Sequence, residues 1–279
     1  MERVLRNTPA TISGIFQVGG VDTDPSPATA TVEVVRENGT VLVAAGTPTT
    51  RVSAGKFSTT LTAAQTALVD ILTARWTSSL GTIETTVEVV GGFLFTVADF
   101  RAMEARFADA TAYPATKIQE ARTLAEQALE NACNVAFVPR YHRERLDGSG
   151  GYVLLTRWPK VRAIRDVKID GTAISAPDLA LAVGRPVGIY SPTAWTYAYG
   201  NVEVTYEHGW KQSDPGRPPA GRPAMMIARD IIAPSQFDAR TTRFETDGGI
   251  MDFARANGDF GIPEVDAFVG RHSYGALIA

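Results

Sequence analysis

Short runs of alternating apolar and polar side chains fill the first ninety residues. Such alternation indicates β-strands with one buried face. The runs are Thr11–Val18, Ala30–Arg36, Thr40–Ala44, Lys56–Leu61, Ile71–Ser78 and Thr82–Val90. Asn38-Gly39 lies between two runs and predicts a two-residue hairpin turn. The spacing predicts an immunoglobulin-like β-sandwich over residues 1–92. The alternation also places the carboxylates of Glu33, Glu84 and Glu88 on its solvent-facing side.

A helical pattern begins after Gly91-Gly92. Thr96-Val97-Ala98-Asp99 resembles a capping box with Asp in place of Glu, and predicts a short helix to about Ala108. A longer helix is predicted from a first turn at Pro114 to Cys133. Its apolar face comprises Ile118, Ala121, Ala125, Ala128, Leu129 and Ala132, and its charged residues Lys117, Glu120, Arg122, Glu126 and Glu130 mostly lie elsewhere. We expect Cys133 to be a small core residue.

Strand-like patterns return between Phe137 and Tyr206. Val138–Leu146 and Tyr152–Thr156, separated by Asp147-Gly148-Ser149-Gly150-Gly151, predict a hairpin with a glycine-rich tip. Further strands are predicted at Val161–Ile169, turned by Asp170-Gly171, and at Asn201–Tyr206, with helices at Ala224–Ala233 and from Pro263. The fold class predicted is α+β: an all-β domain at residues 1–92, then a domain of helices and β-hairpins at residues 93–279.

Composition narrows the function classes. The chain has 279 residues, of which 44% are hydrophobic, and its 27 Lys and Arg against 30 Asp and Glu leave a net charge of −3. Such a charge does not attract nucleic acid or an anionic membrane. No apolar run approaches the roughly 20 residues of a membrane span, and the first residues lack the apolar region of a secretory signal. The single cysteine excludes an internal disulfide and a multi-cysteine zinc site.

Catalytic signatures are scarce. His142, His208 and His272 fall in no HExxH motif and beside no GxSxG serine. Gly148-Ser149-Gly150-Gly151 lacks the Lys-Ser/Thr of a phosphate loop, and Asp22 and Asp24 lack the distal Glu of a calcium loop. We therefore expect no enzymatic activity, no cofactor and no metal. A nucleophile–base pair formed through space is left open.

The densest basic region predicts an interface. Its candidates for inter-subunit or channel-lumen contact are Arg140, Arg143, Arg145, Arg157 and Arg162. Arginine is enriched in protein contacts because its planar guanidinium forms several directed hydrogen bonds. The alternative is a set of solvated strand faces whose arginines pair with nearby Asp and Glu, and near-balanced charge favours this alternative over direct nucleic-acid binding.

Taken together, these segments resemble the tailed-phage head-to-tail connector (adaptor) proteins. In that family a strand ending in an Asp-Gly turn leads to an L-L-P-x-x-P-V type segment and a V-x-V-x-G strand. The matching segments here are Leu146–Gly148, Leu154–Val161, Val167–Gly171, Val204–Trp210 with Arg222-Pro223, and Gly261–Ala267, the last similar to actinobacteriophage versions. The resemblance covers residues 93–279. The N-terminal β-domain and the stretch 174–206 go beyond the minimal adaptor.

The resemblance implies a virion protein of the head–tail interface, assembled in the host bacterial cytoplasm. It would form a homo-oligomeric ring, typically of twelve copies, docked beneath the portal protein and facing a head-closure (stopper) or tail-completion protein. Double-stranded DNA would pass through its lumen without sequence-specific binding, and no membrane would be involved. In the family the C-terminal segment engages the portal, so the candidate portal contacts are Arg271, His272, Tyr274, Leu277 and Ile278. The alternative is a terminal helix packed on its own subunit.

Two other functions are weighed against this one. A tail or surface binding module would use the β-sandwich to contact a glycan or the capsid. A glycan platform needs clustered exposed aromatic side chains, and the N-terminal segment has only Phe16, Phe57 and Trp76. A hydrolase with a β accessory domain is disfavoured by the shortage of histidines.

Overall fold

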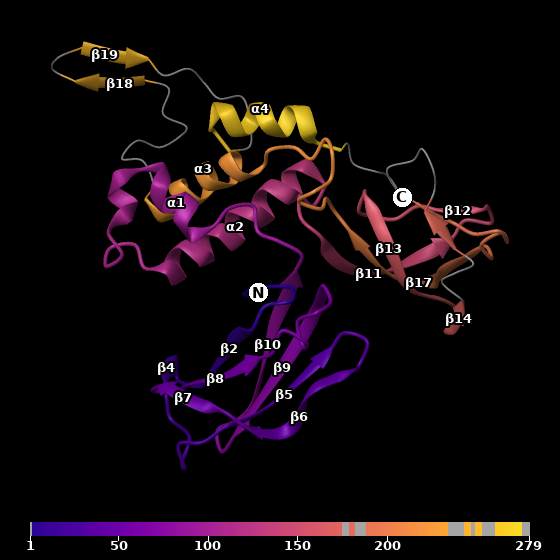
Figure 1. Ribbon diagram of the computed structural model, residues 1–279, viewed down its shortest axis with the longest axis horizontal. Coiled ribbons are helices and arrows are strands. Elements are labelled where there is room, and N and C mark those ends of the chain that lie inside the picture. The colour runs from indigo at the N-terminus through magenta and orange to yellow at the C-terminus, as the bar shows by residue number, and fades with distance from the viewer. Residues whose placement is uncertain are drawn as a thin grey trace.

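The computed structural model describes residues 2–174, 179–181, 188–233, 243–246, 249–252 and 260–274. It is an α+β fold, as predicted. Figure 1 shows a β-rich lobe (indigo to magenta) below a layer of helices, with a further group of strands beside the helices. Within the described residues, no helix has the length and apolar character needed to cross a membrane.

The N-terminal strands form a β-sandwich. One sheet has the order β1 (Glu2–Leu5), β10 (Gly81–Val90), β9 (Asp70–Ser78), β5 (Thr31–Arg36) and β6 (Val41–Pro48). The facing sheet comprises β2 (Ala10–Ile15), β8 (Lys56–Leu61) and β7 (Thr50–Ser53), and β3 (Gln17–Val18) with β4 (Val21–Asp22) forms a small hairpin. β1 pairs with β10 in parallel, whereas the other pairs are antiparallel. Phe16, Phe57 and Trp76 are buried between the sheets.

Local sequence signals predicted most of these strands. Each of the six predicted runs overlaps a strand, and the predicted turn at Asn38-Gly39 joins β5 to β6. Gly39 has a φ of +86°, a left-handed conformation that favours glycine, and the Arg36 amide donates to the Thr40 carbonyl at 2.8 Å. The alternation rule missed β1, β4 and β7, which are short or lack a clean apolar period.

The helical layer contains α1 (Val97–Met103), a 3-10 turn (Ala105–Ala108), α2 (Ala115–Cys133), α3 (Gly221–Ile232) and α4 (Pro263–His272). The predicted capping box is present: the Asp99 amide donates to Thr96 Oγ1 at 3.1 Å, and the Thr96 amide donates to Asp99 Oδ2 at 2.8 Å. Pro114 occupies the N-cap position of α2 rather than its first turn. α3 begins at Gly221, three residues before the predicted start, with Pro223 inside its first turn.

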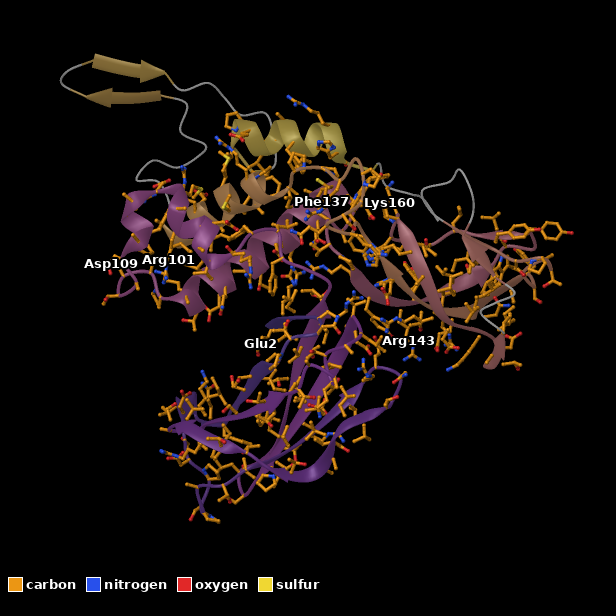
Figure 2. All side chains as sticks on the ribbon, in the orientation of Figure 1. Glu2, Arg101, Asp109, Phe137, Arg143 and Lys160 are labelled. Atoms are coloured by element: carbon orange, nitrogen blue, oxygen red, sulfur yellow. The ribbon has the colours of Figure 1, made fainter. Side chains whose placement is uncertain are left out.

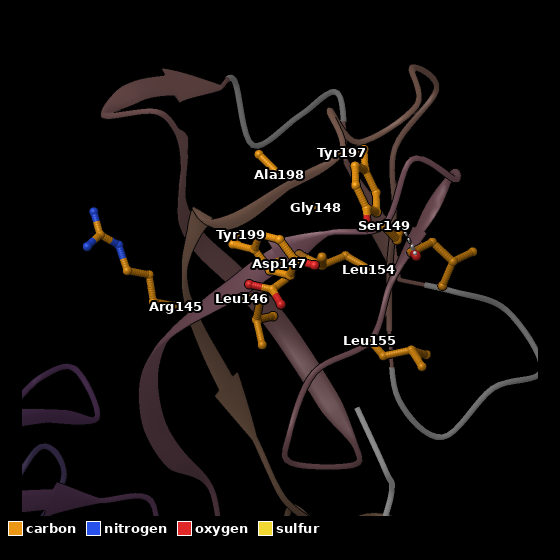
Figure 3. Close-up of a pocket in the computed structure, with 11 residues that line it drawn as sticks. Arg145, Leu146, Asp147, Gly148, Ser149, Leu154, Leu155, Tyr197, Ala198 and Tyr199 are labelled. Atoms are coloured by element: carbon orange, nitrogen blue, oxygen red, sulfur yellow. Dashed lines mark hydrogen bonds between the residues drawn. The ribbon is translucent and has the colours of Figure 1, made fainter.

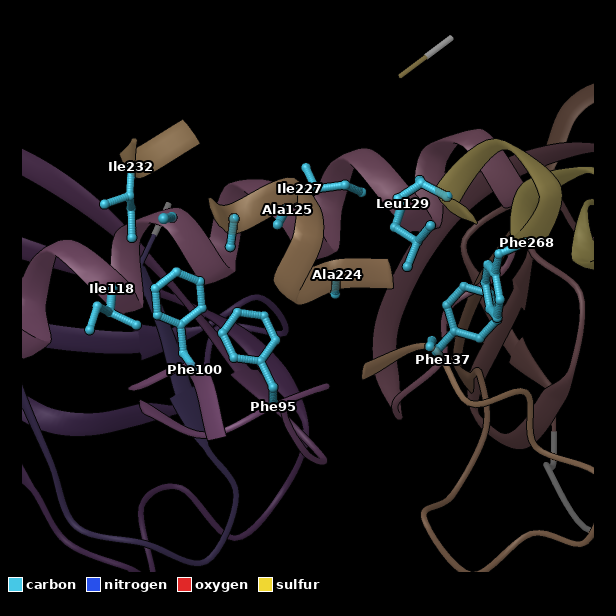
Figure 4. Packing of buried hydrophobic residues seen from close by; sticks show 14 of the residues in the cluster. Phe95, Phe100, Ile118, Ala125, Leu129, Phe137, Ala224, Ile227, Ile232 and Phe268 are labelled. Atoms are coloured by element: carbon cyan, nitrogen blue, oxygen red, sulfur yellow. The ribbon is translucent and has the colours of Figure 1, made fainter. Parts of the chain in front are cut away.

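Small and aromatic side chains build the helical core. Figure 4 shows α2 crossing α3, with Ala125 and Ala224 among the buried contacts and the aromatic rings of Phe95 and Phe100 beside them. Alanine at these contacts lets the two helix backbones approach closely. Cys133 is buried in this core, and burial, with Glu130 nearby, raises the pKa of its thiol to about 12. The thiol is therefore a core group with little thiolate at neutral pH.

A second antiparallel sheet lies beside the helices. Its order is β11 (Arg140–Gly148), β17 (Ala198–His208), β13 (Val161–Ile169) and β14 (Thr172–Ile174). A small sheet contains β12 (Val153–Leu154), β16 (Ile189–Tyr190) and β15 (Ala180–Leu181).

The predicted hairpin across residues 138–156 is wrong in its pairing. β11 pairs with β17, and β12 pairs with β16. β17 carries the apolar face of the sheet through Val202, Val204 and Tyr206, so it takes the central position between β11 and β13. The glycine-rich segment 147–151 is therefore a connection between two sheets.

The last strands form a separate hairpin. β18 (Arg243–Thr246) and β19 (Gly249–Asp252) are antiparallel, with Phe244 opposite Met251. Within the described residues they pair only with each other. Figure 1 shows this hairpin apart from α3 and α4.

Candidate interaction surfaces

A cluster of buried charges joins the β-sandwich to α2 and β11. Its members, here called the junction cluster, are Arg3, Glu88, Glu126, Glu130 and Arg140. Arg3 Nε lies 2.8 Å from Glu88 Oε2, and Arg3 Nη1 lies 3.0 Å from Glu126 Oε2. Arg140 Nη2 lies 3.0 Å from Glu130 Oε2. Their side chains are between 0% and 8% exposed, so the ion pairs are shielded from solvent.

The cluster corrects two sequence expectations. Glu88 was expected on the solvent-facing side of its strand, but its side chain is only 8% exposed because α2 and β11 cover that side. Glu126 and Glu130 were expected away from the buried face of α2, but α2 is buried on a second face by the β-sandwich. Backbone amides of Leu94 and Phe137 donate to these two carboxylates. Desolvation raises the pKa of Glu130, and Arg140 and Arg3 oppose that rise.

The five predicted contact arginines fall in different surroundings. Arg140 is 3% exposed and belongs to the junction cluster. Arg143 bonds Glu203 at 2.8 Å and the Glu37 carbonyl at 3.3 Å, and Figure 2 shows it next to the β-sandwich. Arg162 lies 3.7 Å from Asp214. Arg145 and Arg157 are exposed and form no ion pair within the described residues. Because Arg140 is buried, the predicted inter-subunit or lumen contact would have to be made by the other four arginines.

The C-terminal helix is anchored on its own subunit. Val265 and Phe268 of α4 are buried in the helical core, and the Tyr274 amide donates to the Cys133 carbonyl at 2.8 Å. Arg271 and Tyr274 line a cavity of about 310 Å³ together with Val135 and Trp210. His272 packs its ring against Phe268 at 4.5 Å between centroids. Of the candidate portal contacts, Leu277 and Ile278 lie outside the described residues.

An open groove lies where β11 and β17 meet the glycine-rich connection. This groove, here called the tyrosine groove, has a volume of about 520 Å³ and apolar walls that include Leu146 and Leu154. Figure 3 shows Tyr197 and Tyr199 beside Ser149 and Asp147, with Arg145 farther along the strand. The two tyrosines are 73% and 84% exposed, and their ring centroids lie 6.4 Å apart.

Two more exposed tyrosines belong to the same end of the sheet. Tyr152 and Tyr190 stack with centroids 6.5 Å apart. The Trp195 amide donates to the Gly151 carbonyl at 2.8 Å. This hydrogen bond joins the segment before Tyr152 to the segment before Tyr197. This group was not predicted, because the glycan-binding alternative concerned only the aromatic residues of the N-terminal segment. The alternation Tyr197-Ala198-Tyr199 was the available signal, since alternate residues of an extended segment point to the same side.

Two of the three histidines lie together. The rings of His142 and His208 are 6.0 Å apart, next to Trp158 and Tyr206. The Tyr206 hydroxyl donates to Glu144 at 2.8 Å, and burial lowers the pKa of both histidines. Among the described residues, no group of three or more His, Cys, Asp or Glu side chains is arranged to hold a metal ion.

The aspartates weighed as calcium ligands serve other contacts. Asp24 forms a two-pronged ion pair with Arg51 at 2.9 and 2.6 Å, and that hydrogen bonding lowers the pKa of Asp24 to about 2. Asp22 accepts a hydrogen bond from Gln17 at 2.8 Å.

Comparison with known proteins finds similarity only among solved structures. No family model matches the chain, and no curated protein matches it. A chain in the neck of a native gene transfer agent (GTA) particle computed with C12 symmetry is 17% identical, covers 66% of this chain and 91% of its own length, and has a TM-score of 0.44. A chain in the neck of an empty GTA particle computed with C6 symmetry is 18% identical, with coverages of 67% and 93% and a TM-score of 0.45.

A third similar chain comes from the virion of a native GTA particle. It is 16% identical, with coverages of 67% and 92% and a TM-score of 0.47. At TM-scores of 0.44 to 0.47 these likenesses carry no functional argument. The function proposed below is therefore argued from this chain's own residues.

Proposed function

We propose that this chain is a structural protein of a phage-like virion neck. Copies of it form a ring, of twelve subunits in the family it resembles, which joins the portal to a head-closure or tail-completion protein and extends the DNA channel. The observation that carries the proposal is that the connector-like segments, separate in sequence, lie in adjacent strands. Leu146–Gly148 ends β11, Val167–Gly171 ends β13, and Val204–Trp210 includes the end of β17 between them.

The turn residues of these segments support the proposal. Asp170 and Gly171 have φ angles of +50° and +78°, which makes the Asp-Gly pair the tight turn between β13 and β14. Gly209 has a φ of +93°, and a Cβ atom there would overlap the Val138 carbonyl oxygen. The glycine of the Gly-Trp turn is therefore required by close backbone approach. At these two turns the resemblance in sequence therefore has a structural cause, since the backbone conformation favours or requires glycine.

The β-sandwich is assigned a role outside the ring. We propose that residues 1–92 form an added domain and residues 93–279 the connector domain. The junction cluster supports a fixed attachment, because separating the two parts would expose five buried charged side chains.

Ring and portal contacts are proposed at the four predicted arginines other than Arg140 and at the C-terminal segment. Arg143, Arg145, Arg157 and Arg162 would face a neighbouring subunit or the lumen, and Arg271, His272 and Tyr274, with Leu277 and Ile278, would face the portal. DNA would pass through the lumen without sequence-specific contact, as the resemblance implies, and the chain's net charge of −3 gives no overall attraction to the phosphate backbone.

The glycan-binding alternative has no specific observation in its favour. Phe16, Phe57 and Trp76 are 2%, 1% and 0% exposed. They fill the core of the β-sandwich and offer no ring face to a sugar.

Imaging of the particle neck by electron microscopy tests the proposal. A closed ring of this chain directly below the portal is expected. An empty position there, with the chain on the tail or shell instead, would overturn the connector function.

A further test addresses the portal contact. A chain lacking residues 275–279 keeps the Tyr274–Cys133 hydrogen bond and should fold, yet lose co-sedimentation with the portal. Full-length chain carrying Arg106→Ala, an exposed substitution on the 3-10 turn, is the control and should still co-sediment. Unchanged co-sedimentation of the truncated chain would contradict the assignment of Leu277 and Ile278 as portal contacts.

A further inference from the structure

The central strand of the second sheet, β17, connects two different surface features. Its first residues, Ala198 and Tyr199, line the tyrosine groove. Beyond its last residue, His208, the chain continues into the loop 211–217. Trp210, just before this loop, packs against the helical core, so the loop lies on the helical side of the sheet. At about 3.3 Å per residue, the length of β17 separates the two features by roughly 30 Å. The loop of one copy therefore does not reach the groove of the same copy.

The loop 211–217, here called the proline turn, has a conformation that its own sequence favours. The Arg217 amide donates to the Asp214 carbonyl at 3.2 Å, which closes a four-residue turn. Pro215 occupies the second position of this turn, and Gly216, with a φ of +77°, occupies the third. This is the residue pattern of a type II turn, since proline fixes φ at about −65° and glycine tolerates a positive φ. The exposed ring of Pro215 is thus carried on a well-defined turn.

Contacts with its own subunit hold the proline turn in place. The Lys211 amide donates to Asp214 Oδ2 at 2.6 Å. Arg217 Nε donates to the Phe137 carbonyl at 2.9 Å, and Arg162 Nη1 lies 3.7 Å from Asp214 Oδ2. A surface that is ordered before binding loses little conformational freedom when it binds. The proline turn is therefore suited to bind as a preformed surface.

The tyrosine groove has the chemistry to accept such a turn. Tyr197 and Tyr199 are 73% and 84% exposed, and Leu146 and Leu154 line the groove with them. Exposed tyrosines supply rigid, amphipathic contact area at low conformational cost. Proline-containing segments dock in aromatic-lined grooves, because the proline backbone is restricted before it binds. The exposed ring of Pro215 therefore fits the walls of this groove.

The two features carry opposite charges. Lys211 is the first residue of the proline turn and is exposed. Asp147 is exposed on the groove wall, next to Tyr199 in Figure 3, and forms no ion pair within the described residues. Opposite charges at the rim of an interface favour association and fix its register. An ion pair between Lys211 and Asp147 would accompany the contact of Pro215 with the tyrosines.

We propose that the proline turn of one copy docks in the tyrosine groove of the next copy. Pro215 packs against Tyr197 and Tyr199, and Lys211 approaches Asp147. A contact between two different patches on two copies is heterologous, and its repetition closes a ring when the rotation allows. The inference rests on the proposed function, since it names a contact that repeats around the ring.

Cross-linking in assembled particles tests the contact. Particles are assembled with a full-length chain that carries Ser149→Cys in the groove and Ser213→Cys on the proline turn, two exposed positions, and a short bis-maleimide is added. Cys133 is buried, so the introduced thiols are the accessible ones. A ladder of cross-linked multimers is expected on a denaturing gel. The control combines Ser213→Cys with Ser53→Cys, an exposed position on β7, and should remain largely monomeric. Absence of multimers above this control would overturn the docking contact.

Truncation of an exposed tyrosine gives an independent measurement. Tyr199→Ala should weaken self-association of the full-length chain, measured by sedimentation velocity, by about tenfold. Its thermal stability should be unchanged, because the side chain is 84% exposed. Leu124→Ala on α2 removes a side chain that is 53% exposed away from the groove, and should leave self-association unchanged. Equal self-association of the two variants would overturn the proposal. Loss of binding to another neck protein by Tyr199→Ala, with normal self-association, would also overturn it and assign the groove to that protein.

A double-mutant cycle tests the predicted ion pair. Lys211→Glu should weaken self-association, whereas Lys117→Glu on α2 makes the same change in net charge away from the turn and should not. Asp147→Asn removes the charge but keeps the side-chain oxygen that accepts the Gly200 amide, so the local fold is preserved. In the Asp147→Asn background, Lys211→Glu should have a smaller effect than in the wild type. An equal effect in both backgrounds would contradict the predicted pairing of Lys211 with Asp147.

The docking contact and the connector function can fail separately. A closed ring in the particle neck, without the cross-link between turn and groove, refutes the docking contact and keeps the connector function. A cross-linked ladder from particles whose neck holds no ring of this chain supports the contact and refutes the connector function.

Discussion

Removal of Arg3 is predicted to destabilise the whole chain. Its guanidinium lies 2.8 Å from Glu88, 3.0 Å from Glu126 and 3.6 Å from Glu130, and its side chain is 4% exposed. At an effective dielectric of about 20, one such contact at about 3 Å carries a gross attraction of about 5 kcal/mol. Desolvation of the buried charges offsets much of this gain. Arg3→Met loses the attraction but leaves the carboxylates buried, so we expect a loss of about 3–5 kcal/mol.

Urea unfolding followed by tryptophan fluorescence measures this loss. The control is Arg75→Met in the same β-sandwich, because Arg75 pairs with Glu33 and Glu84 while its side chain is 50% exposed. Exposed pairs contribute about 0–1 kcal/mol. Adding Glu130→Gln to Arg3→Met should recover part of the stability, since it removes one of the three buried carboxylates that would then share Arg140 alone. A loss for Arg3→Met no larger than that for Arg75→Met would refute the reasoning.

The same variant should respond to pH in a defined direction. The pKa of Glu130 is already raised above its ordinary value of 4.5, and loss of Arg3 removes a cation that opposes the rise. A raised carboxyl pKa means that the folded state binds protons more readily than the unfolded state, so its unfavourable effect is relieved as pH falls. The stability difference between wild type and Arg3→Met should therefore narrow between pH 7 and pH 5. A stability difference that stays constant between pH 7 and pH 5 would contradict the inference that loss of Arg3 raises the pKa of Glu130 further.

Three further outcomes are expected. Burial lowers the pKa of His208, so the folded state resists protonation, and stability should fall as pH drops through the ordinary pKa of 6.5. In thermal melts, the stability of His208→Phe should therefore depend less on pH than that of the wild type. Gly148→Ala should destabilise the fold strongly, because its Cβ would overlap the Thr196 carbonyl, whereas the Cβ of Gly151→Ala meets only Ser149 Oγ at 3.7 Å. Chemical denaturation measures both variants, and an equal loss of stability would contradict this difference in packing. Thr96→Ala removes the α1 cap and should cost about 1 kcal/mol, a value that an unchanged denaturation midpoint would rule out.

Local signals predicted the elements because their causes are local. The capping box of α1 requires only two side chains three residues apart, and the Asn38-Gly39 turn requires only a left-handed glycine. Alternation likewise predicted β8 and β13 with their bounds as observed, since period two depends on neighbouring residues alone.

Tertiary partners account for what the sequence did not predict. Alternation places Glu88 opposite its apolar neighbours, but whether that side meets water depends on where α2 and β11 pack. The glycines at 148–151 permit a turn, but β11 pairs with β17, whose residues lie fifty or more positions later in the chain. The tyrosine groove likewise combines β11, the segment around Tyr152 and the start of β17, so no single window of sequence contains it.

The pairing of β1 has a consequence for the order of folding. Arg3 and Glu88 are 85 positions apart, and Arg3 and Glu126 are 123 apart. β1 is therefore synthesised before its only strand neighbour among the described residues, and the five-stranded sheet cannot be completed until β10 has been made. The charged contacts of Arg3 wait longer still, until α2 is present. Contacts of such long sequence separation slow folding, because the intervening loop must be ordered before they form. β1 is thus synthesised well before β10 and α2, the two elements that hold it in place.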